Sequence, residues 1–335
     1  MKVYNIALIG CGHMGEEHLK HIYFKENICV NCVCDKDEAK AKAFARRFGA
    51  KIFSTDAKEC IARKEVDIVI IATYPSSHLA LLELCIKYKK HVICEKPIAS
   101  NLEDGKRFVE LVKANPDVKV LIGHILRHNQ TYRKVAKMIH EGAIGKPIIM
   151  RMTQNHHTMD WERYRRLLEE ASPIVDCGVH YFDVMRWFTD AEIVNVSGIG
   201  MRTEEDLPPD KNNYEMVTVT LSDGSIGFYE AGWTKTISSN NMKEFVGPRG
   251  SIRLIFAKDR HSHQEEGDLI EYYDLETRTY NNINVLAERK PTDIQITCLI
   301  RMIEENLPAR PTIDEVYESF SVAMNARNNY MGVVK

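Results

Sequence analysis

The sequence predicts an α/β protein with a doubly wound parallel sheet in its first third and an α+β domain, built on an open and mainly antiparallel sheet, in the rest. Three observations support this prediction. Short apolar runs alternate with helical segments up to about residue 125, a glycine-rich turn follows the first run, and alternating apolar and polar segments dominate the later chain. Strands that are apolar on both faces are typical of parallel sheets covered by helices on both sides.

The first domain is expected to span residues 1–125. Its strands are predicted at 4–10, 28–35, 51–53, 67–73, 91–94 and 118–122, and its helices at 14–24, 37–48, 56–64, 76–88 and 101–114. Ligands of such sheets bind beyond the carboxyl ends of the strands. The residues at or just past these ends include Gly10, Asp35, Thr73 and Glu95.

The second domain is expected to span residues 126–335, and its C-terminal helix is also compatible with packing back on the first domain. Helices are predicted at 130–141, 178–188, 292–306 and 314–329, and strands at 148–154, 193–199, 215–221, 225–233, 245–256 and 269–273. Turns at 222–225 and 248–251 separate some of these strands, which is typical of antiparallel hairpins. We therefore expect an antiparallel sheet with helices on one face.

Composition excludes several classes of partner. The 335 residues carry 45 basic and 47 acidic side chains, a net charge of -2, which gives no electrostatic reason to expect nucleic acid or an anionic membrane. No apolar run is long enough to span a bilayer, and the start of the chain lacks the features of a signal peptide. These observations favour a cytoplasmic protein.

The nine cysteines are scattered and odd in number, so we expect reduced thiols rather than a disulfide framework. Cys29 and Cys32 have the spacing of a metal-binding pair. They fall in a predicted strand, where residues three apart point to opposite faces, so they are expected to be buried thiols. No metal site is predicted.

The glycine-rich turn reads Gly10-Cys11-Gly12-His13-Met14-Gly15. It follows a predicted strand and opens a helix, which is the context of a dinucleotide-binding turn. Gly10 would permit the tight turn, Gly12 the approach of a pyrophosphate, and Gly15 the packing of helix on strand. The helix N-terminus would add free N–H groups and a positive dipole end. The alternative, a turn without a ligand, does not explain this context.

Asp35 ends the second predicted strand, twenty residues after Gly15, where a carboxylate would accept hydrogen bonds from the adenosine ribose. Its charge would repel a 2′-phosphate and therefore favours NAD. Lys36 follows directly and could offset that repulsion, so NADP stays possible.

Two further motifs complete a resemblance. Glu95-Lys96-Pro97 follows the fifth predicted strand, and Asp176-x-Gly178-x-His180-x-x-Asp183 lies downstream. With the glycine turn, they resemble the glucose–fructose oxidoreductase and inositol dehydrogenase family, Gfo/Idh/MocA. The resemblance covers nearly the whole chain. It implies a Rossmann domain, a second domain with an open antiparallel sheet, and a homodimer or homotetramer.

The chain departs from the family pattern in two places. The family often has a run of small residues before the aspartate, where this chain has residues 168–175, with two glutamates. The approach to the substrate is therefore expected to differ. After the sixth strand, Ile125-Leu126-Arg127-His128 keeps only the arginine of the common Asn-Arg-Arg-Phe pattern.

The resemblance assigns the catalytic roles to Lys96, Asp176 and His180. His180 would take the hydroxyl proton, and Lys96 would stabilise alkoxide character or, if burial lowers its pKa, act as the base. Asp176 lies four residues before His180, on the same face if both share a helix, and could orient the imidazole. The alternatives are a core or capping histidine, an N-cap aspartate and a solvated lysine.

Further contacts are expected around these residues. The cofactor would contact Gly10, Gly12, His13, Met14, Gly15, Asp35, Thr73, Tyr74, Pro75, His78, Glu95, Lys96 and His124. The substrate would contact Lys96, Asn155, His156, Trp161, Arg163, Asp176 and His180. Trp161 and Arg163 are expected in a loop over the site, although an exposed helix explains them equally well. His128 is expected to be structural.

These residues predict an NAD(P)-dependent oxidoreductase that transfers a hydride to or from a secondary alcohol of a sugar, a sugar derivative or a cyclitol. Two alternatives remain. One is a glycosidase or lyase in which bound NAD is reduced and regenerated in each cycle. The other is a dinucleotide-binding regulator without activity.

Overall fold

The computed structural model describes residues 2–260 and 266–328, and these form two compact units. Unit 1 comprises Met1–Ile125 and Lys290–Tyr317, and unit 2 comprises Leu126–Arg289 and Glu318–Lys335. The predicted boundary after residue 125 therefore coincides with the first division. Residues 290–317, which the sequence placed in the second domain, group with the first unit instead.

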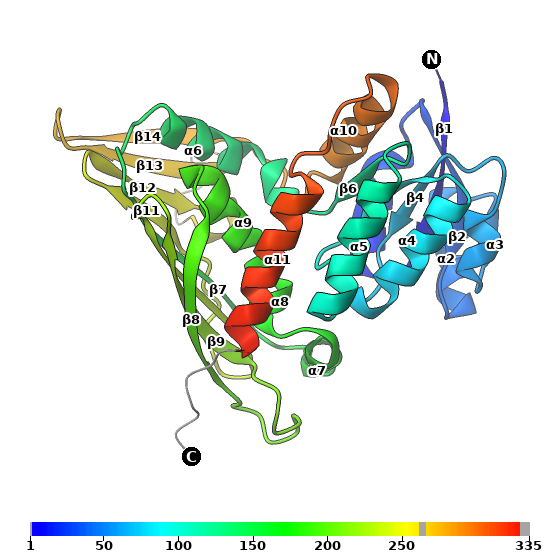
Figure 1. Ribbon diagram of the computed structural model, residues 1–335, viewed down its shortest axis with the longest axis horizontal. Coiled ribbons are helices and arrows are strands. Elements are labelled where there is room, and N and C mark those ends of the chain that lie inside the picture. Colours follow the sequence, from blue (N-terminus) through cyan, green and yellow to red (C-terminus); the bar gives the residue numbers. More distant parts are fainter. Residues whose placement is uncertain (1, 261–265, 329–335) are drawn as a thin grey trace. The chain divides into compact units, whose positions relative to one another are not determined.

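Unit 1 is built on a parallel sheet (Figure 1). Within the described residues its six strands are β1 (Tyr4–Ile9), β2 (Ile28–Cys34), β3 (Ile52–Ser54), β4 (Ile68–Ile71), β5 (His91–Cys94) and β6 (Val120–Ile122). Their order is β3-β2-β1-β4-β5-β6, the doubly wound order that the sequence predicts. The central strand β4 is buried throughout, which explains its unbroken apolar sequence.

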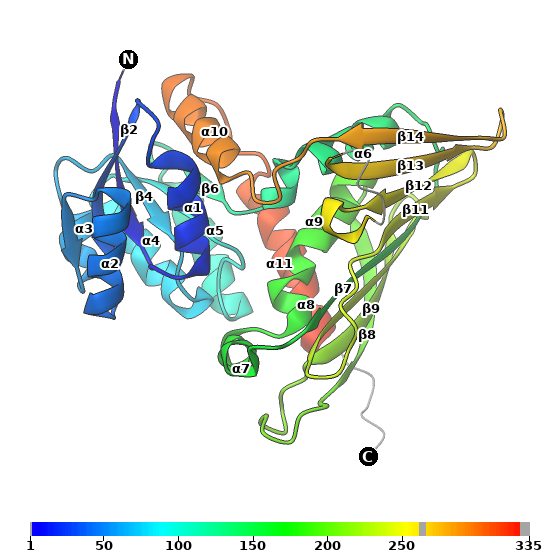
Figure 2. The same cartoon turned by 180° about the vertical axis from the view of Figure 1, so that it is seen from behind.

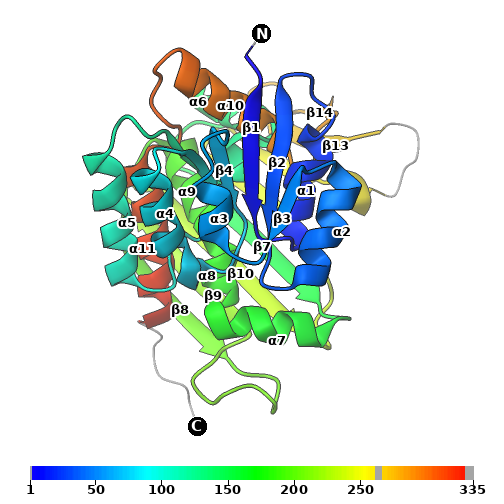
Figure 3. The ribbon, with the colours of Figure 1, turned by 90° about the vertical axis from the view of Figure 1, so that its right-hand side faces the viewer.

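The helices of unit 1 lie on both faces of this sheet, as Figure 3 shows for α1 and α2 on one side and α4 and α5 on the other. They are α1 (His13–Ile22), α2 (Glu38–Phe48), α3 (Ala57–Ile61), α4 (His78–Lys87), α5 (Leu102–Ala114) and α10 (Thr292–Glu304), with short 3-10 turns η1 (Pro75–Ser77) and η2 (Ile125–Arg127), the latter reaching into unit 2. Gly49 ends α2 in the left-handed conformation at φ 69°, as its position predicts. Helix α10 packs on α1 and completes the core with Ile296 and Leu299.

Unit 2 is built on a mainly antiparallel sheet (Figure 2). Its eight strands in the described residues are β7 (Ile149–His157), β8 (Ile193–Met201), β9 (Tyr214–Leu221), β10 (Ile226–Thr234), β11 (Lys243–Gly247), β12 (Gly250–Ile255), β13 (Asp268–Asp274) and β14 (Thr279–Val285). The order is β14-β13-β12-β11-β7-β10-β9-β8, and only the β7–β10 pair in this described sheet is parallel. The predicted fold class is thus confirmed.

Helices cover one face of the second sheet. They are α6 (Gln130–His140), α7 (Trp161–Glu170), α8 (Pro173–Asp176) and α9 (Gly178–Thr189), with the short turn η3 (Ala257–Asp259), while α11 (Ile313–Asn328) runs through the boundary between the units after Tyr317. Phe188 of α9 lies 5.1 Å from Phe245 of β11 between ring centres. Phe182 lies 6.1 Å from Tyr229 of β10. The large aromatic side chains of α9 therefore seal this face.

One prediction about the cysteines is wrong. Cys32 on β2 and Cys60 on α3 form a disulfide, with their Cα atoms 5.8 Å apart. The two cysteines lie 28 positions apart in the sequence, and only the packing of α3 on β2 brings them together. No sequence spacing therefore predicts this disulfide. Cys29 is a half-buried free thiol. Among the described helices, none has both the length and the apolar character needed to cross a membrane.

Candidate active site

The glycine turn joins β1 to α1 in the geometry that its sequence predicts. Gly10 has a φ of 102°, and a Cβ there would lie 2.4 Å from the carbonyl oxygen of Ala72. A Cβ on Gly15 would lie 2.1 Å from the carbonyl oxygen of Gly10. At Gly12, in contrast, a Cβ would meet no described atom within 4 Å. Two glycines thus permit close packing within the protein, and the third leaves open space beside the start of α1.

The Asp35 side chain holds the glycine turn through a hydrogen bond to its backbone. Its Oδ2 accepts a hydrogen bond from the Cys11 N–H at 2.8 Å, and its Oδ1 accepts one from the Asp37 N–H at 2.9 Å. Burial and the nearby Asp35 carboxylate raise the pKa of the Cys11 thiol to about 12, so this cysteine stays protonated. The carboxylate oxygens keep lone pairs for further donors.

These features fit a dinucleotide. The open space at Gly12 adjoins the first turn of α1, where N–H groups and the helix dipole favour phosphate. The half-buried Asp35 carboxylate lies at the end of the neighbouring strand, where ribose hydroxyls can donate to it. When bound, the nicotinamide ring of such a cofactor accepts or donates a hydride.

The segment after β4 forms a second part of the unit 1 site. Thr73 Oγ1 lies 2.7 Å from Ser77 Oγ, Tyr74 is 48% exposed, and Pro75 is buried at the start of η1. His78 was expected to contact the cofactor, but it is fully buried, with its ring nitrogens 3.1 Å from the Thr73 carbonyl oxygen and 3.0 Å from that of Pro97. Its imidazole therefore links the segment after β4 to the segment that carries Lys96.

Glu95 directly follows β5 and is buried within unit 1. Its carboxylate is buried, and Oε1 lies 2.8 Å from His18 Nε2. Burial raises the pKa of Glu95, but the hydrogen bond from His18 and the neighbouring basic groups outweigh it and hold the pKa below its ordinary value. Lys96 follows, half-buried, and His124 is buried at the end of β6. Glu95 and His18 thus anchor the segment that carries Lys96.

Asp176 and His180 lie in unit 2, but not on one continuous helix as expected. Asp176 is the last residue of α8, Cys177 connects the two helices, and His180 lies in the first turn of α9. Ser172 caps α8, and Cys177 takes the cap position of α9, so the alternative that Asp176 is an N-cap is wrong. Both predicted catalytic residues of this unit are half-buried and close in sequence and fold.

Asn155 and His156 were both expected to contact substrate, but their side chains lie on opposite faces of β7. Successive residues of β7 point to opposite faces. His156 is opposite Trp233 on the helix-covered face, whereas the Asn155 amide donates to Glu230 Oε1 at 2.6 Å on the other face. Asn155 therefore does not lie on the face that carries α8 and α9.

His156 belongs to a polar group on the helix-covered face. Its Nδ1 lies 3.2 Å from the Tyr164 hydroxyl, and its Nε2 lies 3.1 Å from the Gln154 amide nitrogen. Burial lowers the pKa of His156, and Asp176 partly counters this effect with its charge. The imidazole is therefore neutral near pH 7, with Nε2 accepting from Gln154 and Nδ1 donating to Tyr164.

The segment of Trp161 and Arg163 was expected as a loop, and it is the helix α7. Trp161 donates through Nε1 to Asp206 at 2.6 Å, and Lys235 lies over its ring. Arg163 is exposed. The residue of this helix that reaches the polar group around His156 is instead Tyr164.

Sequence analysis missed Lys243, which is fully buried at the start of β11. Its Nζ donates to the carbonyl oxygens of Thr153 and Met242 and, at 2.8 Å, to Asn241 Oδ1. It also lies 4.4 Å from the centre of the Tyr181 ring, next to His180. Alternation along the strand places Lys243 on the same face as Phe245, and this signal could have identified it.

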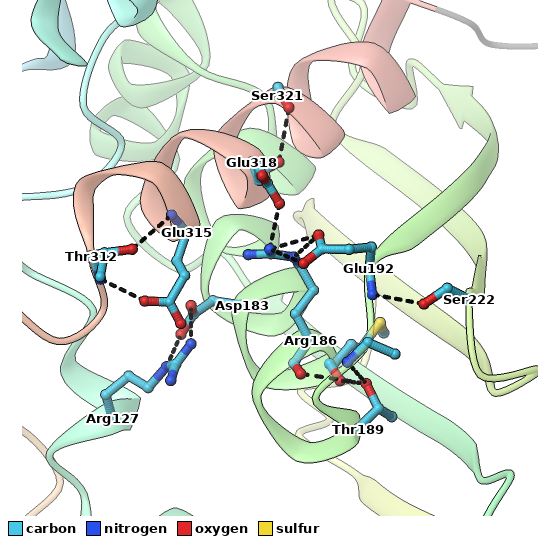
Figure 4. Close-up of polar contacts among 12 residues, drawn as sticks. Arg127, Asp183, Arg186, Thr189, Glu192, Ser222, Thr312, Glu315, Glu318 and Ser321 are labelled. Carbon is cyan, nitrogen blue, oxygen red and sulfur yellow. Dashed lines mark hydrogen bonds and ion pairs between the residues drawn. The ribbon is translucent and has the colours of Figure 1, made fainter. Parts of the chain in front are cut away.

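Helix α9 is held by two arginines, the half-buried Arg127 and the buried Arg186 (Figure 4). Arg127 donates from Nε and Nη2 to the two oxygens of Asp183, each at 2.8 Å. Arg186 donates to both oxygens of Glu192 and also pairs with Glu318. The arginine that remains of the family pattern therefore fixes the helix that carries His180.

The predicted site residues are thus distributed over both units. Unit 1 provides the glycine turn, Asp35, Thr73 and Lys96, and unit 2 provides Asp176, His180 and His156. Within residues 2–260 and 266–328, no three His, Cys, Asp or Glu side chains are grouped so that they could hold a metal ion.

Family models match most of the chain. The model described as "Oxidoreductase family, NAD-binding Rossmann fold" matches residues 4–124. The model of the GFO/IDH/MocA C-terminal domain matches residues 132–253.

Over the aligned residues, curated relatives are identical to the chain at about a quarter of the positions. The inositol 2-dehydrogenase of Rubrobacter xylanophilus is 26% identical over 253 residues, which is 74% of this chain and 70% of that protein. The scyllo-inositol 2-dehydrogenase (NAD(+)) of Bacillus subtilis is 27% identical over 261 residues, 77% of this chain and 75% of that one.

Solved structures share the fold. The myo-inositol 2-dehydrogenase of Lactobacillus plantarum superposes with a TM-score of 0.81 at 20% identity, over 98% of this chain and 97% of that one. The apo scyllo-inositol dehydrogenase of Lactobacillus casei gives 0.79 at 19% identity, over 98% and 96%. With the glycine turn, the two sheets and both domain models in agreement, the chain belongs to the GFO/IDH/MocA family of NAD-binding oxidoreductases.

Proposed function

We propose that the protein is an NAD-dependent dehydrogenase that oxidises a secondary alcohol of a cyclitol or sugar, or catalyses the reverse reaction. The observation that carries the proposal is the polar group on the helix-covered face of the unit 2 sheet. There, His156 and Tyr164 lie beside the helices of Asp176 and His180, among otherwise apolar aromatic packing. Neutral donors and acceptors of this kind suit the hydroxyl groups of a polyol.

Each proposed catalytic residue has one task. His180 takes the hydroxyl proton of the substrate, because an imidazole titrates near neutral pH. Lys96 donates a hydrogen bond to the same oxygen as negative charge develops on it. Asp176 holds a neighbouring hydroxyl or the imidazole of His180. We propose these roles from the family motifs, which match the chain at all three positions.

NAD is the proposed cofactor in preference to NADP. The support is the Asp35 carboxylate at the end of β2, which would repel a 2′-phosphate. The Bacillus subtilis relative, a scyllo-inositol 2-dehydrogenase (NAD(+)), agrees with this preference.

The test is a panel of inositols, aldoses, anhydrosugars and nucleotide sugars, each incubated with NAD or NADP and followed by NADH or NADPH absorbance. We expect free NADH to accumulate with at least one cyclitol or sugar. Cleavage of an anhydrosugar or glycoside without free NADH would instead establish the recycled-cofactor reaction. Tight NAD binding without turnover on the whole panel would establish a regulator.

We also propose a homo-oligomer, with the face of the unit 2 sheet opposite the helices as its interface. The strand registers place exposed apolar side chains there, among them Ile149, Ile199, Met201, Ile226 and Tyr280. A second copy of the chain would remove this surface from water. Light scattering should give a mass above one chain for the wild type and a lower mass for Ile226→Lys.

A further inference from the structure

A lysine far from the glycine turn in sequence reaches it in the fold. Lys290 Nζ lies 2.5 Å from His13 Nε2 and 3.5 Å from Met14 Sδ. His13 and Met14 are the two residues between Gly12 and Gly15, and all of these positions belong to unit 1. The first turn of α1 therefore has a neighbouring ammonium group that no residue of the motif supplies.

The position of Lys290 is set by the docking of α10 on α1. Thr292, two residues further on, is fully buried, and its hydroxyl donates to the Glu17 carbonyl oxygen at 3.0 Å. The same hydroxyl lies 2.8 Å from His21 Nδ1. Leu299 continues this contact into the core of the unit. Lys290 is thus held beside the turn by a rigid helix–helix contact.

The electrostatics of this position favour a bound anion. The start of α1 carries the positive end of the helix dipole, and His13 and Lys290 add two basic groups there. Glu17 is a nearby carboxylate. Burial raises its pKa, and Lys20, Lys290 and His13 hold the pKa below its ordinary value. Glu17 already accepts a hydrogen bond from Lys20, so it balances only part of this positive charge.

We propose that Lys290 binds the pyrophosphate of the dinucleotide, as a cofactor-binding residue outside the glycine motif. The inference rests on the proposed function in taking a nicotinamide dinucleotide as the ligand. A compact ammonium group suits a phosphate oxygen, and its hydrogen bond to His13 holds Nζ beside the residue that follows Gly12, where a Cβ would meet open space. The glycine turn orients the two phosphates, and Lys290 adds the charge that the turn lacks.

The test measures binding directly, without turnover. Dissociation constants of NAD, ADP, AMP and adenosine are determined by calorimetry for the wild type, Lys290→Ala and Lys290→Arg. We expect Lys290→Ala to weaken NAD and ADP binding by about tenfold, AMP less, and adenosine not at all. Lys290→Arg should keep most of the affinity. The wild-type affinity for ADP should also fall more steeply with salt than that of Lys290→Ala.

Lys20→Ala is the matched control, since Lys20 lies on α1, the helix that follows the glycine turn, and pairs with Glu16 and Glu17. It should leave all four constants unchanged. If Lys290→Ala binds NAD and ADP as tightly as the wild type, the inference is wrong, and a lowered melting temperature would then identify a structural lysine. If the wild type binds NAD but oxidises no alcohol, the proposed function fails while the Lys290 comparison still stands.

Discussion

Lys243 lies directly under the aromatic ring of Tyr181, the residue that follows the proposed base His180. The 4.4 Å between Nζ and the ring centre is a cation–π distance, and the oxygens that Nζ contacts are uncharged carbonyl and amide oxygens. Nζ is therefore surrounded by uncharged dipoles and a π-face, and burial still disfavours its charged form.

This burial makes stability depend on pH. Burial holds the pKa of Lys243 well below its ordinary value of 10.5, so the unfolded chain binds a proton that the folded chain gives up more readily. Stability then rises with pH between the folded and the unfolded pKa. We expect Lys243→Met to show a smaller rise in the free energy of unfolding between about pH 7 and about pH 10 than the wild type.

Urea unfolding at several pH values measures this difference. The exposed Lys137→Met on α6 serves as the control and should follow the wild type. Equal slopes for Lys243→Met and the wild type would show that the lysine is not held neutral in the folded state.

Glu95 gives the opposite dependence. Its pKa lies below the ordinary value of 4.5, because the stabilisation by His18 outweighs the burial of the carboxylate. Its contribution is therefore present above pH 4.5 and is lost as the pH falls through the folded value. Glu95→Gln should lower the free energy of unfolding at pH 7 by about 1–3 kcal/mol and weaken the loss of stability in acid. The exposed Glu110→Gln on α5, measured in parallel by denaturation, should do neither.

The Arg127–Asp183 pair should contribute strongly to the stability of unit 2. Asp183 is buried, and removal of its charge takes the two-point carboxylate contact away from the half-buried Arg127 guanidinium. We expect Asp183→Asn to cost about 3 kcal/mol in a denaturation experiment. Arg127→Lys should also destabilise, because lysine cannot make the two-point contact. The surface pair of Arg151 and Glu244 is the comparison, and Glu244→Gln should cost less than about 1 kcal/mol.

Catalysis should depend on Lys96 and His180 far more than dinucleotide binding does. We expect Lys96→Ala and His180→Ala to lose about 10²- to 10⁴-fold in kcat, since each removes a proton-transfer or charge-stabilising group. The dissociation constant of NAD should change little in His180→Ala. His140→Ala, on α6, is the control histidine. Near-normal turnover in either active-site variant would refute the assigned role.

The charge of Asp35 should set the cofactor preference. Asp35→Asn keeps an oxygen that can accept from the Cys11 N–H but removes the negative charge. We expect the ratio of kcat/KM for NAD to that for NADP to fall by about tenfold. Lys36→Ala should shift the ratio the other way if the lysine offsets Asp35. An unchanged ratio in Asp35→Asn would assign the discrimination to another residue.

The sequence predicted most elements because their apolar periodicity is strong, as in the fully buried strand β4. Helix α7 was expected as a loop although Trp161, Tyr164 and Leu168 recur at helical spacing, because most of its other residues are charged and only Leu168 is buried. Cys177, which separates the helices of Asp176 and His180, has a helical backbone (φ -88°, ψ -39°), so the sequence carries no breaking residue that would mark this division. Lys243 and Lys290 were missed since a charged residue normally indicates solvent, and only tertiary packing places these two.

Helix α10 has a consequence for how the chain folds during synthesis. Ile296 and Leu299 belong to the same apolar cluster as Ile6 and Leu19, so this core is completed only when residue 304 of 335 has been made. Until then the nascent Rossmann sheet leaves the ribosome with part of one apolar face uncovered. Residues 292–304 thus close the first domain, and a protein truncated before α10 would expose that face to aggregation.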